Sequence, residues 1–192
     1  MWRWVMALIA TLATTAGLAA EDRAIDVSTS RLTIHVFKSG IFSAFADNHQ
    51  VDARIASGML NETSVNIVAR TSELTVVDPN ASESTRAEVQ RRMLCPDVLD
   101  SERFPEITFK STVVEPAGND RWRVTGELIL HGRARPLSVT VTERAGHYLG
   151  SFALKQRDFG IEPVSIAGGV VKVKDELTIE FDIVSAPRRV PS

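Results

Sequence analysis

The chain has 192 residues, with 24 acidic and 22 basic side chains and a formal net charge of −2. The basic residues stand singly or in pairs, such as Arg91 with Arg92, whereas a nucleic-acid phosphate backbone requires a basic stripe, so no nucleic-acid partner is expected. Cys95 is the only cysteine, which excludes an intramolecular disulfide, and the fold must therefore rest on its hydrophobic core.

Residues 1–20 have the layout of a secretory signal peptide. A short start containing Arg3 is followed by an apolar run that continues through small residues to Ala20, with acidic residues directly after it. Cleavage is predicted after Ala19 or Ala20, and the mature protein is expected to be periplasmic or secreted. An uncleaved anchor is the competing interpretation, but a membrane span needs about 20 strongly apolar residues and this run is shorter. No later stretch is apolar enough to span a bilayer.

From Arg31 onward the hydrophobic pattern has a period of two. Leu32, Ile34 and Val36 fall on one side of an extended segment, and Thr33 and His35 fall on the other. This alternation is typical of a half-buried antiparallel strand. The same pattern predicts further strands around residues 51–55, 65–67, 107–113, 121–130, 137–141, 152–154 and 176–183.

One segment, residues 78–102, interrupts the alternation and is predicted to contain one short helix within residues 82–95. Thr85 and Glu88 have the spacing of a capping box, and Val89 and Met93 share one helical face. Pro96 is expected to end the helix.

Short turns containing glycine, proline and asparagine separate the strands, which predicts antiparallel neighbours. The sequence therefore indicates one all-β domain over residues 21–185, followed by a short tail over 186–192. A sheet of about eight strands with one apolar face either packs on a second sheet or closes into a barrel, and closure removes exposed edges. The interior of such a barrel is either filled by side chains or holds one small ligand, and periodicity does not choose between these.

Three ordered motifs carry a resemblance to a known family. They are Phe104-Pro-Glu-Ile-Thr-Phe-Lys-Ser111, Val124-Thr-Gly-Glu-Leu-Ile-Leu-His-Gly132 running on to Pro136, and Asp158-Phe-Gly-Ile161. Together they resemble the YceI-like family of periplasmic lipid-binding proteins, from about Ile25 to Val184. The resemblance implies a lipocalin-like antiparallel β-barrel with an elongated apolar cavity that takes up an isoprenoid or similar amphiphile without catalysis.

Inward-facing apolar side chains are the expected ligand contacts. The candidates are Leu32, Ile34, Val36, Phe42, Phe45, Ile55, Val89, Met93, Phe109, Trp122, Leu128, Phe152, Phe159, Ile179 and Phe181. Asp47 and His49 are the candidates for a polar mouth. Members of the family often carry two histidines one residue apart here, and Asp47 stands in place of the first, so any role of that pair is in doubt for this chain.

Catalytic and metal sites have little support in the sequence. The histidines at 35, 49, 131 and 147 lie on or beside different predicted strands, without the close spacing of a zinc site. Asp47 with His49 is the least improbable metal fragment, because both would point to one face of an extended segment. No Gly-x-Ser-x-Gly elbow exposes a nucleophile. Neither a metal nor a cofactor is expected, apart from a bound lipid-like molecule.

The leading hypothesis is a non-catalytic periplasmic carrier or reservoir for a long apolar amphiphile, such as a polyisoprenoid, a quinone-like lipid or a fatty acyl compound. The alternative is a filled barrel that acts as a stress-protective or interaction scaffold for a protein partner. A metal-assisted enzyme around Asp47 and His49 is the remote alternative. A homodimer is expected only by analogy with barrel relatives.

Overall fold

The computed structural model describes residues 21–39, 49–166 and 171–186. The predicted signal peptide, Phe42, Phe45 and Asp47 lie outside the described residues. In chain order the elements are β1 (Arg23–Ala24), β2 (Arg31–Ser39), β3 (His49–Ala53), β4 (Ile55–Leu60), β5 (Val65–Arg70), η2 (Thr71–Glu73), β6 (Thr75–Val76), α1 (Glu83–Leu94), β7 (Glu106–Pro116), β8 (Arg121–Leu130), β9 (Arg133–Arg144), β10 (His147–Lys155), η3 (Gln156–Phe159), β11 (Ser165–Ile166) and β12 (Val171–Val184).

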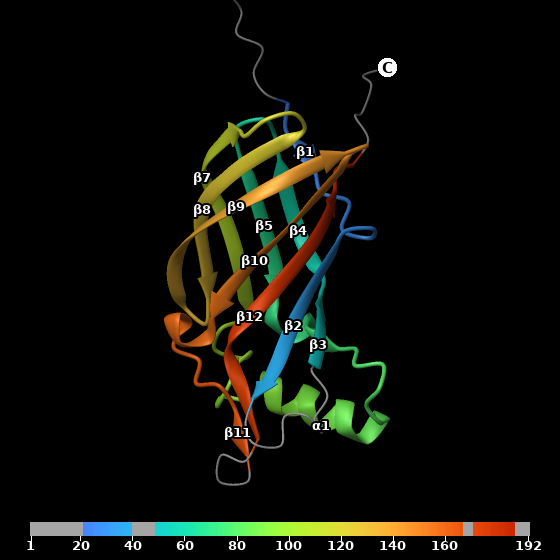
Figure 1. Cartoon of the computed structure of the whole chain (residues 1–192), viewed down its shortest axis with the longest axis vertical. Coiled ribbons are helices and arrows are strands. Elements are labelled where there is room, and N and C mark those ends of the chain that lie inside the picture. The colour runs from blue at the N-terminus through green and yellow to red at the C-terminus, as the bar shows by residue number, and fades with distance from the viewer. Residues whose placement is uncertain (1–20, 40–48, 167–170, 187–192) are drawn as a thin grey trace, which may run out of the picture.

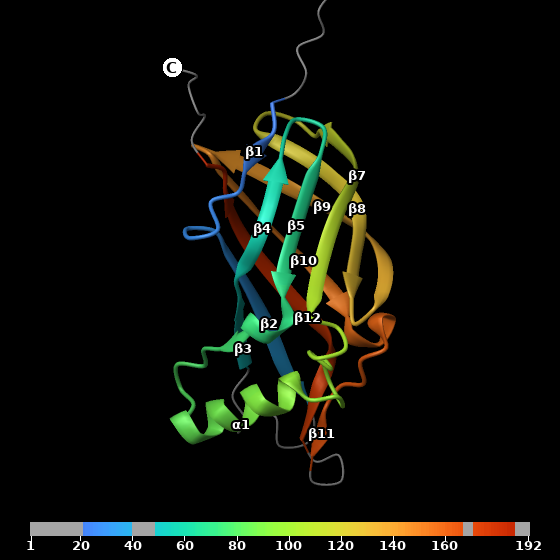
Figure 2. The same cartoon turned by 180° about the vertical axis from the view of Figure 1, so that it is seen from behind.

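The fold is an all-β sheet curled into a half-barrel, with every described strand pair antiparallel (Figures 1 and 2). Eleven strands follow one another in the order β1-β4-β5-β7-β8-β9-β10-β12-β2-β3-β6, and β11 pairs only with β12. The described residues thus contain twelve strands, more than the predicted eight or so. Three of the additional strands, β1, β6 and β11, have two residues each and are too short to show an alternation. The fourth arises because the predicted strand around 51–55 is divided into β3 and β4.

The strands near the two ends of this strand order meet at Arg54, and we call this meeting place the seam. β3 pairs with β2 near one end of the order and β4 pairs with β5 near the other, although only Arg54 separates them along the chain. Nearby, the Ile25 amide donates to the Gly58 carbonyl (3.0 Å) and the Asp26 amide donates to the Val184 carbonyl (2.8 Å). The segment after β1 therefore joins β4 to β12. It lies at one end of the half-barrel, which we call the upper end.

Two tight turns produce the long β8–β9–β10 meander. His131 and Gly132 have φ values of 51° and 68°, and Ala145 and Gly146 have values of 51° and 84°. Positive φ at both central residues is the geometry of the two-residue hairpin turn whose twist matches that of the strands. The prediction that short connections make these neighbours antiparallel is confirmed.

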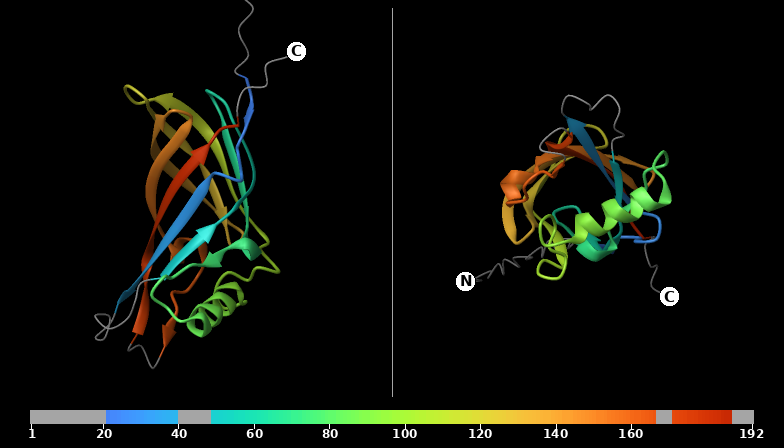
Figure 3. Two further views of the ribbon diagram at one scale, coloured as in Figure 1. Left: turned by 90° about the vertical axis from the view of Figure 1, so that its right-hand side faces the viewer. Right: turned by 90° about the horizontal axis from the view of Figure 1, so that it is seen from below.

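The one predicted helix is confirmed as α1, which crosses the opposite, lower end of the sheet (Figure 3). Its N-cap is Ser82, whose Oγ accepts from the Thr85 amide (3.2 Å), so the capping-box interpretation of Thr85 with Glu88 is wrong by one turn. The Gln90 side chain ties α1 to the chain around β6, because its Oε1 accepts from the Val76 amide (2.8 Å) and its Nε2 donates to the Leu74 carbonyl (2.7 Å). Among the described residues, no helix has the length and apolar character needed to cross a membrane.

Packed clusters of side chains lie at the seam and beside η3. At the seam, Ile25, Ile55 and Ile183 pack together and are at most 5 % exposed. Beside η3, Phe159 and Ile161 are each 3 % exposed and pack with leucines of β8. These clusters leave the middle of the curled sheet to the cavity described next.

Candidate ligand-binding cavity

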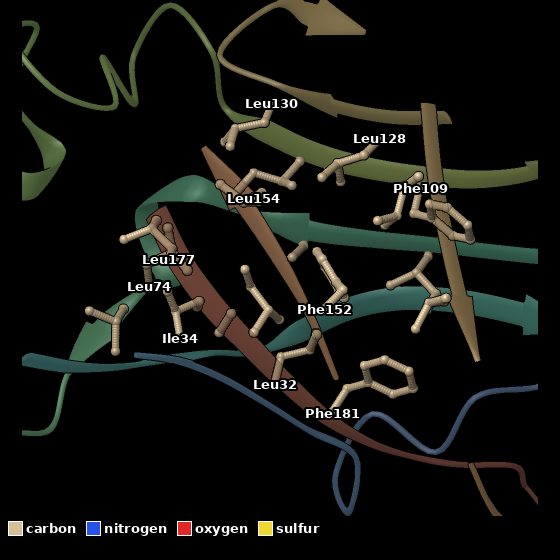
Figure 4. Close-up of a pocket in the computed structure, with 18 of the residues that line it drawn as sticks. Leu32, Ile34, Leu74, Phe109, Leu128, Leu130, Phe152, Leu154, Leu177 and Phe181 are labelled. Carbon is tan, nitrogen blue, oxygen red and sulfur yellow. The ribbon is translucent and has the colours of Figure 1, made fainter. Parts of the chain in front are cut away.

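An elongated cavity of about 750 Å³ occupies the interior of the curled sheet (Figure 4). Its wall consists of the inward-facing residues of the alternating strands together with one face of α1. The lining includes these predicted contacts: Leu32, Ile34, Val36, Val89, Met93, Phe109, Trp122, Leu128, Phe152, Ile179 and Phe181. The alternation brings them together because successive side chains of a strand point to opposite faces.

The interior is hollow, which the sequence left open. The cavity volume falls within the range of about 300–1,000 Å³ that is typical of small-molecule sites. Figure 4 shows Phe109, Phe152 and Phe181 among the side chains that point into this space from three different strands. A cavity with such walls favours an apolar occupant, since it offers few hydrogen-bond partners to water.

Polar side chains reach the cavity at its two ends. At the lower end they are Lys38, His49, Thr85, Glu88, Arg92 and Gln156. At the upper end they are Arg23, Asn61, Glu62, Glu143 and Tyr148. Between the ends the wall is apolar, so the cavity matches a molecule with a long apolar body and a polar terminus.

A buried carboxylate fixes His49 at the lower end. His49 Nδ1 donates to Asp78 Oδ2, and the Gln50 amide donates to Asp78 Oδ1 (2.5 Å). Asp78 is only 2 % exposed, and a buried carboxylate requires partners within the protein. Here both carboxylate oxygens have one. Arg86 adds a bond to the Asp78 carbonyl (3.2 Å). His49 therefore has one orientation against the cavity, with one ring nitrogen already engaged.

At the upper end Arg23 and Tyr148 form a linked pair. Arg23 Nη2 donates to Tyr148 Oη (2.6 Å), and its guanidinium carbon lies 5.8 Å from the centroid of the Tyr148 ring. A second bond runs from Arg23 Nη1 to Ser185 Oγ (3.3 Å). Neither residue is among the predicted contacts, because Arg23 belongs to a two-residue strand and Tyr148 follows a turn.

Two predicted contacts lie elsewhere. Ile55 is absent from the cavity lining, because Ile25 covers it at the seam where the sheet ends meet. Phe159 is also absent, because it belongs to the short η3 helix, which turns its ring onto β8 instead of into the cavity. Both are apolar and buried, so burial alone does not place a residue in the cavity wall.

The histidines have local partners. His35 Nε2 lies 3.4 Å from Glu180 Oε2 without a hydrogen bond, His147 Nδ1 lies 2.8 Å from Asp182 Oδ1, and His131 Nδ1 lies 3.2 Å from the Phe159 carbonyl oxygen. In the part of the chain that the structure describes, no group of three or more histidine, cysteine or acidic side chains could hold a metal ion. Asp47 lies outside that part, so the Asp47 and His49 fragment stays a hypothesis.

Several lining residues were not among the predicted contacts. Leu137, Val139 and Val141 alternate within a predicted strand, so their periodicity could have identified them as cavity residues. Leu74, Val98 and Leu99 also line the cavity, but they lie in turns and loops where no periodicity indicates a direction.

Comparisons with known proteins agree with this architecture. The model of the YceI-like domain family matches residues 24–185. A UPF0312 protein of Vibrio parahaemolyticus is 29 % identical over 183 residues, covering 85 % of this chain and 88 % of the relative. A UPF0312 protein of Shewanella denitrificans is 28 % identical over 180 residues, covering 84 % and 87 %.

Two solved structures share the fold. The crystal structure of BcnA from Burkholderia cenocepacia superposes with a TM-score of 0.59 at 17 % identity, covering 84 % of this chain and 99 % of that protein. A polyisoprenoid-binding domain from Saccharophagus degradans, implicated in plant cell wall breakdown, has a TM-score of 0.59 at 16 % identity, with 88 % and 100 % covered. At these identities the likeness concerns the fold alone.

Proposed function

The chain belongs to the YceI-like family, and from this premise we propose that it is a non-catalytic carrier or reservoir for one long apolar amphiphile. The observation that carries the proposal is the elongated cavity of about 750 Å³, apolar along its length and polar at its ends. The related fold of a polyisoprenoid-binding domain supports an isoprenoid, a quinone-like lipid or a fatty acyl compound as the ligand class.

Energetics favours a long ligand. Each buried methylene contributes about 0.8 kcal/mol, whereas association costs about 4–15 kcal/mol in lost freedom. A short apolar molecule does not offset that cost, and a long tail does. The wall supplies aromatic and aliphatic contacts along the whole length of such a tail.

The lower end is the proposed position of the polar head group. His49 is held there by Asp78, and Lys38 and Arg92 also line this end. These side chains offer hydrogen-bond donors to a head group, while the tail extends between Phe109 and Phe152 toward the upper end.

The test is to purify the protein gently, extract it with organic solvent and identify the extract by mass spectrometry. We expect one long-chain amphiphile in near-stoichiometric amount. Leu128→Trp should lose it, because Leu128 lines the cavity and indole would occupy the ligand's space. The matched control is Glu127→Trp, whose side chain is on the exposed face of β8 and should leave the extract unchanged. A lipid-free protein that also takes up no isoprenoid or fatty acyl compound would refute the proposal.

Export is part of the same proposal. Residues 1–20 are proposed to direct the chain out of the cytoplasm and then to be removed, so that the carrier acts in the periplasm or outside the cell. The intact mass of protein recovered from the periplasm of a bacterial host should correspond to a chain that begins at Ala20 or Glu21. A mass that includes Met1 would contradict cleavage.

A further inference from the structure

Pairing between β9 and β10 stops shortly after the turn that joins them. The register pairs His147 with Arg144 and ends at Leu149 with Thr142. Both strands run on well beyond this point, β9 back to Arg133 and β10 to Lys155. Continuing the same register would place Phe152 opposite Val139, but the described residues have no strand pairing there. Figure 1 shows the lower part of β9 bowing away from β10.

β9 and β10 separate from each other but not from their outer neighbours. On its other side β9 pairs with β8 along its length, from Arg133 with Leu130 to Thr142 with Arg121. On its other side β10 pairs with β12 from end to end. The two strands are therefore regular and fully supported from outside, and a slit lies between them.

A groove of about 850 Å³ follows this slit on the outer surface. The outward side chains along its unpaired part are small, namely Ser138, Thr140, Ser151 and Ala153, whereas Arg144 and Leu149 border it beside the paired turn and Glu180 borders it from β12. A Cβ on Gly150 would lie 2.4 Å from Cζ of Phe181 and 2.9 Å from the Thr140 carbonyl oxygen, so β9 and β10 are still close at Gly150 and the slit lies beyond it, toward Lys155. No long side chain of these two strands obstructs access to the slit at these positions.

The groove and the interior cavity share part of their lining. Leu137, Val139, Phe152 and Phe181 border both spaces. At this place the wall between solvent and cavity is therefore a single layer of apolar side chains without a backbone ladder behind it. Opening such a layer requires rotamer changes, which occur in picoseconds to nanoseconds when side chains are free to move. Opening any fully paired seam instead requires backbone hydrogen bonds to break.

Both ends of the slit are closed. Above it, the β9–β10 ladder is intact from Thr142 to the turn. Below it, η3 occupies the space between the strands, where the Phe159 carbonyl accepts from His131 Nδ1 (3.2 Å). The lower end of the cavity is itself covered by α1, which is tied by two hydrogen bonds of Gln90. In the described part of the wall, the slit is thus a place where no strand ladder has to break.

We propose that the slit between β9 and β10 is a lateral portal through which the ligand, tail first and then head group, passes into and out of the cavity. This inference rests on the proposed function and adds the route to it. Leu137, Val139 and Phe152 are the gate, since their side chains separate the groove from the cavity.

The first test locks the slit. In a Cys95→Ser background, Thr140→Cys with Ser151→Cys places two thiols across it, to be joined by oxidation or by a short bifunctional thiol reagent. Ile129→Cys with Ala134→Cys is the matched control across the paired β8–β9 ladder, where the two residues are direct neighbours, both are exposed and neither borders the groove or the cavity. Uptake of the fluorescent fatty acid cis-parinaric acid from phosphatidylcholine vesicles is followed by stopped flow.

Closing the slit should slow uptake and release by about tenfold or more, because passage then requires separation of a covalently closed seam. The control cross-link should leave both rates unchanged, and cleavage of the slit cross-link should restore them. Unchanged rates in the closed protein would overturn the portal. A wild-type protein that binds no cis-parinaric acid from either vesicles or solution would instead refute the proposed function on which the portal rests.

A second pair of variants needs no cross-link. Leu137→Ala removes part of the gate, whereas Leu177→Ala removes an equal side chain that lines the same cavity at a position paired on both sides, with Leu154 and with Val36. We expect Leu137→Ala to raise the uptake rate and the release rate together by several-fold. Leu177→Ala should raise only the release rate, through weaker binding. Equal uptake rates in the two variants would contradict the inference.

Discussion

Phe152 and Phe159 are close in sequence and adjoin the same apolar cluster, but only Phe152 borders the cavity. Phe152 is half-buried and lines the cavity, and Phe159 is 3 % exposed and packed against Leu128, Leu130 and Ile161. The hollow wall and the packed clusters are built from the same residue types. The difference shows that position relative to the cavity, and not hydrophobicity, separates a ligand contact from a core residue in this molecule.

Truncating the two rings is the largest expected effect and tests that comparison directly. Phe159→Ala should lower the free energy of unfolding by about 3–5 kcal/mol, because it opens a void in a packed cluster. Phe152→Ala should cost clearly less stability, since it enlarges a space that already exists, and should instead weaken lipid binding. Urea denaturation and cis-parinaric acid titration measure the two quantities. Equal losses of stability would remove the distinction between wall and cluster.

The buried carboxylate at the lower end should give the next largest effect. Asp78→Ala leaves the Gln50 amide and His49 without their partner, and hydrogen bonds to a charged group contribute about 1.5–3 kcal/mol each. We expect a loss of about 3 kcal/mol in the free energy of unfolding. Asp97→Ala is the control, an exposed aspartate beside the same helix, and should change stability by less than about 0.5 kcal/mol. A loss in Asp78→Ala no larger than in the control would show that the network is not structural.

The tie between α1 and β6 should give a smaller effect. Gln90→Ala removes two hydrogen bonds to backbone groups, so a loss of about 1–2 kcal/mol is expected. Amide hydrogen exchange should speed up at Val76, whose amide Gln90 satisfies, and remain unchanged in the fully paired β8. Arg91→Ala, an exposed neighbour on α1, is the control. Unchanged exchange at Val76 in Gln90→Ala would contradict this role.

The wall of the cavity could be predicted from the sequence because alternation is a direct consequence of strand geometry. Leu32, Ile34 and Val36 show this, since their spacing alone predicts the face that lines the cavity. The helix within residues 82–95 was predictable from the apolar spacing of Val89 and Met93 and from Pro96, although its predicted cap was one turn too late. The ordered motifs supplied the family, which the match over residues 24–185 confirms.

The rest depends on long-range contacts that no local pattern encodes. Asp78 bonds to His49 across a large sequence separation, so nothing around Asp78 indicates its partner. Ile55 has the alternation of a cavity residue, and only the seam covers it with Ile25. The sequence does not predict the slit below Thr142 for the same reason. β9 and β10 both alternate normally, and only the missing pairing between them marks the slit.

The most direct test of the central claim is the affinity of the protein for a homologous series of saturated fatty alcohols, measured by displacement of cis-parinaric acid. If the apolar cavity holds the tail, each added methylene should strengthen binding by about 0.8 kcal/mol, or about fourfold in Kd, until the tail fills the cavity and the gain stops. Leu128→Trp should bring that limit to a shorter chain. An affinity that does not change with chain length would contradict the account.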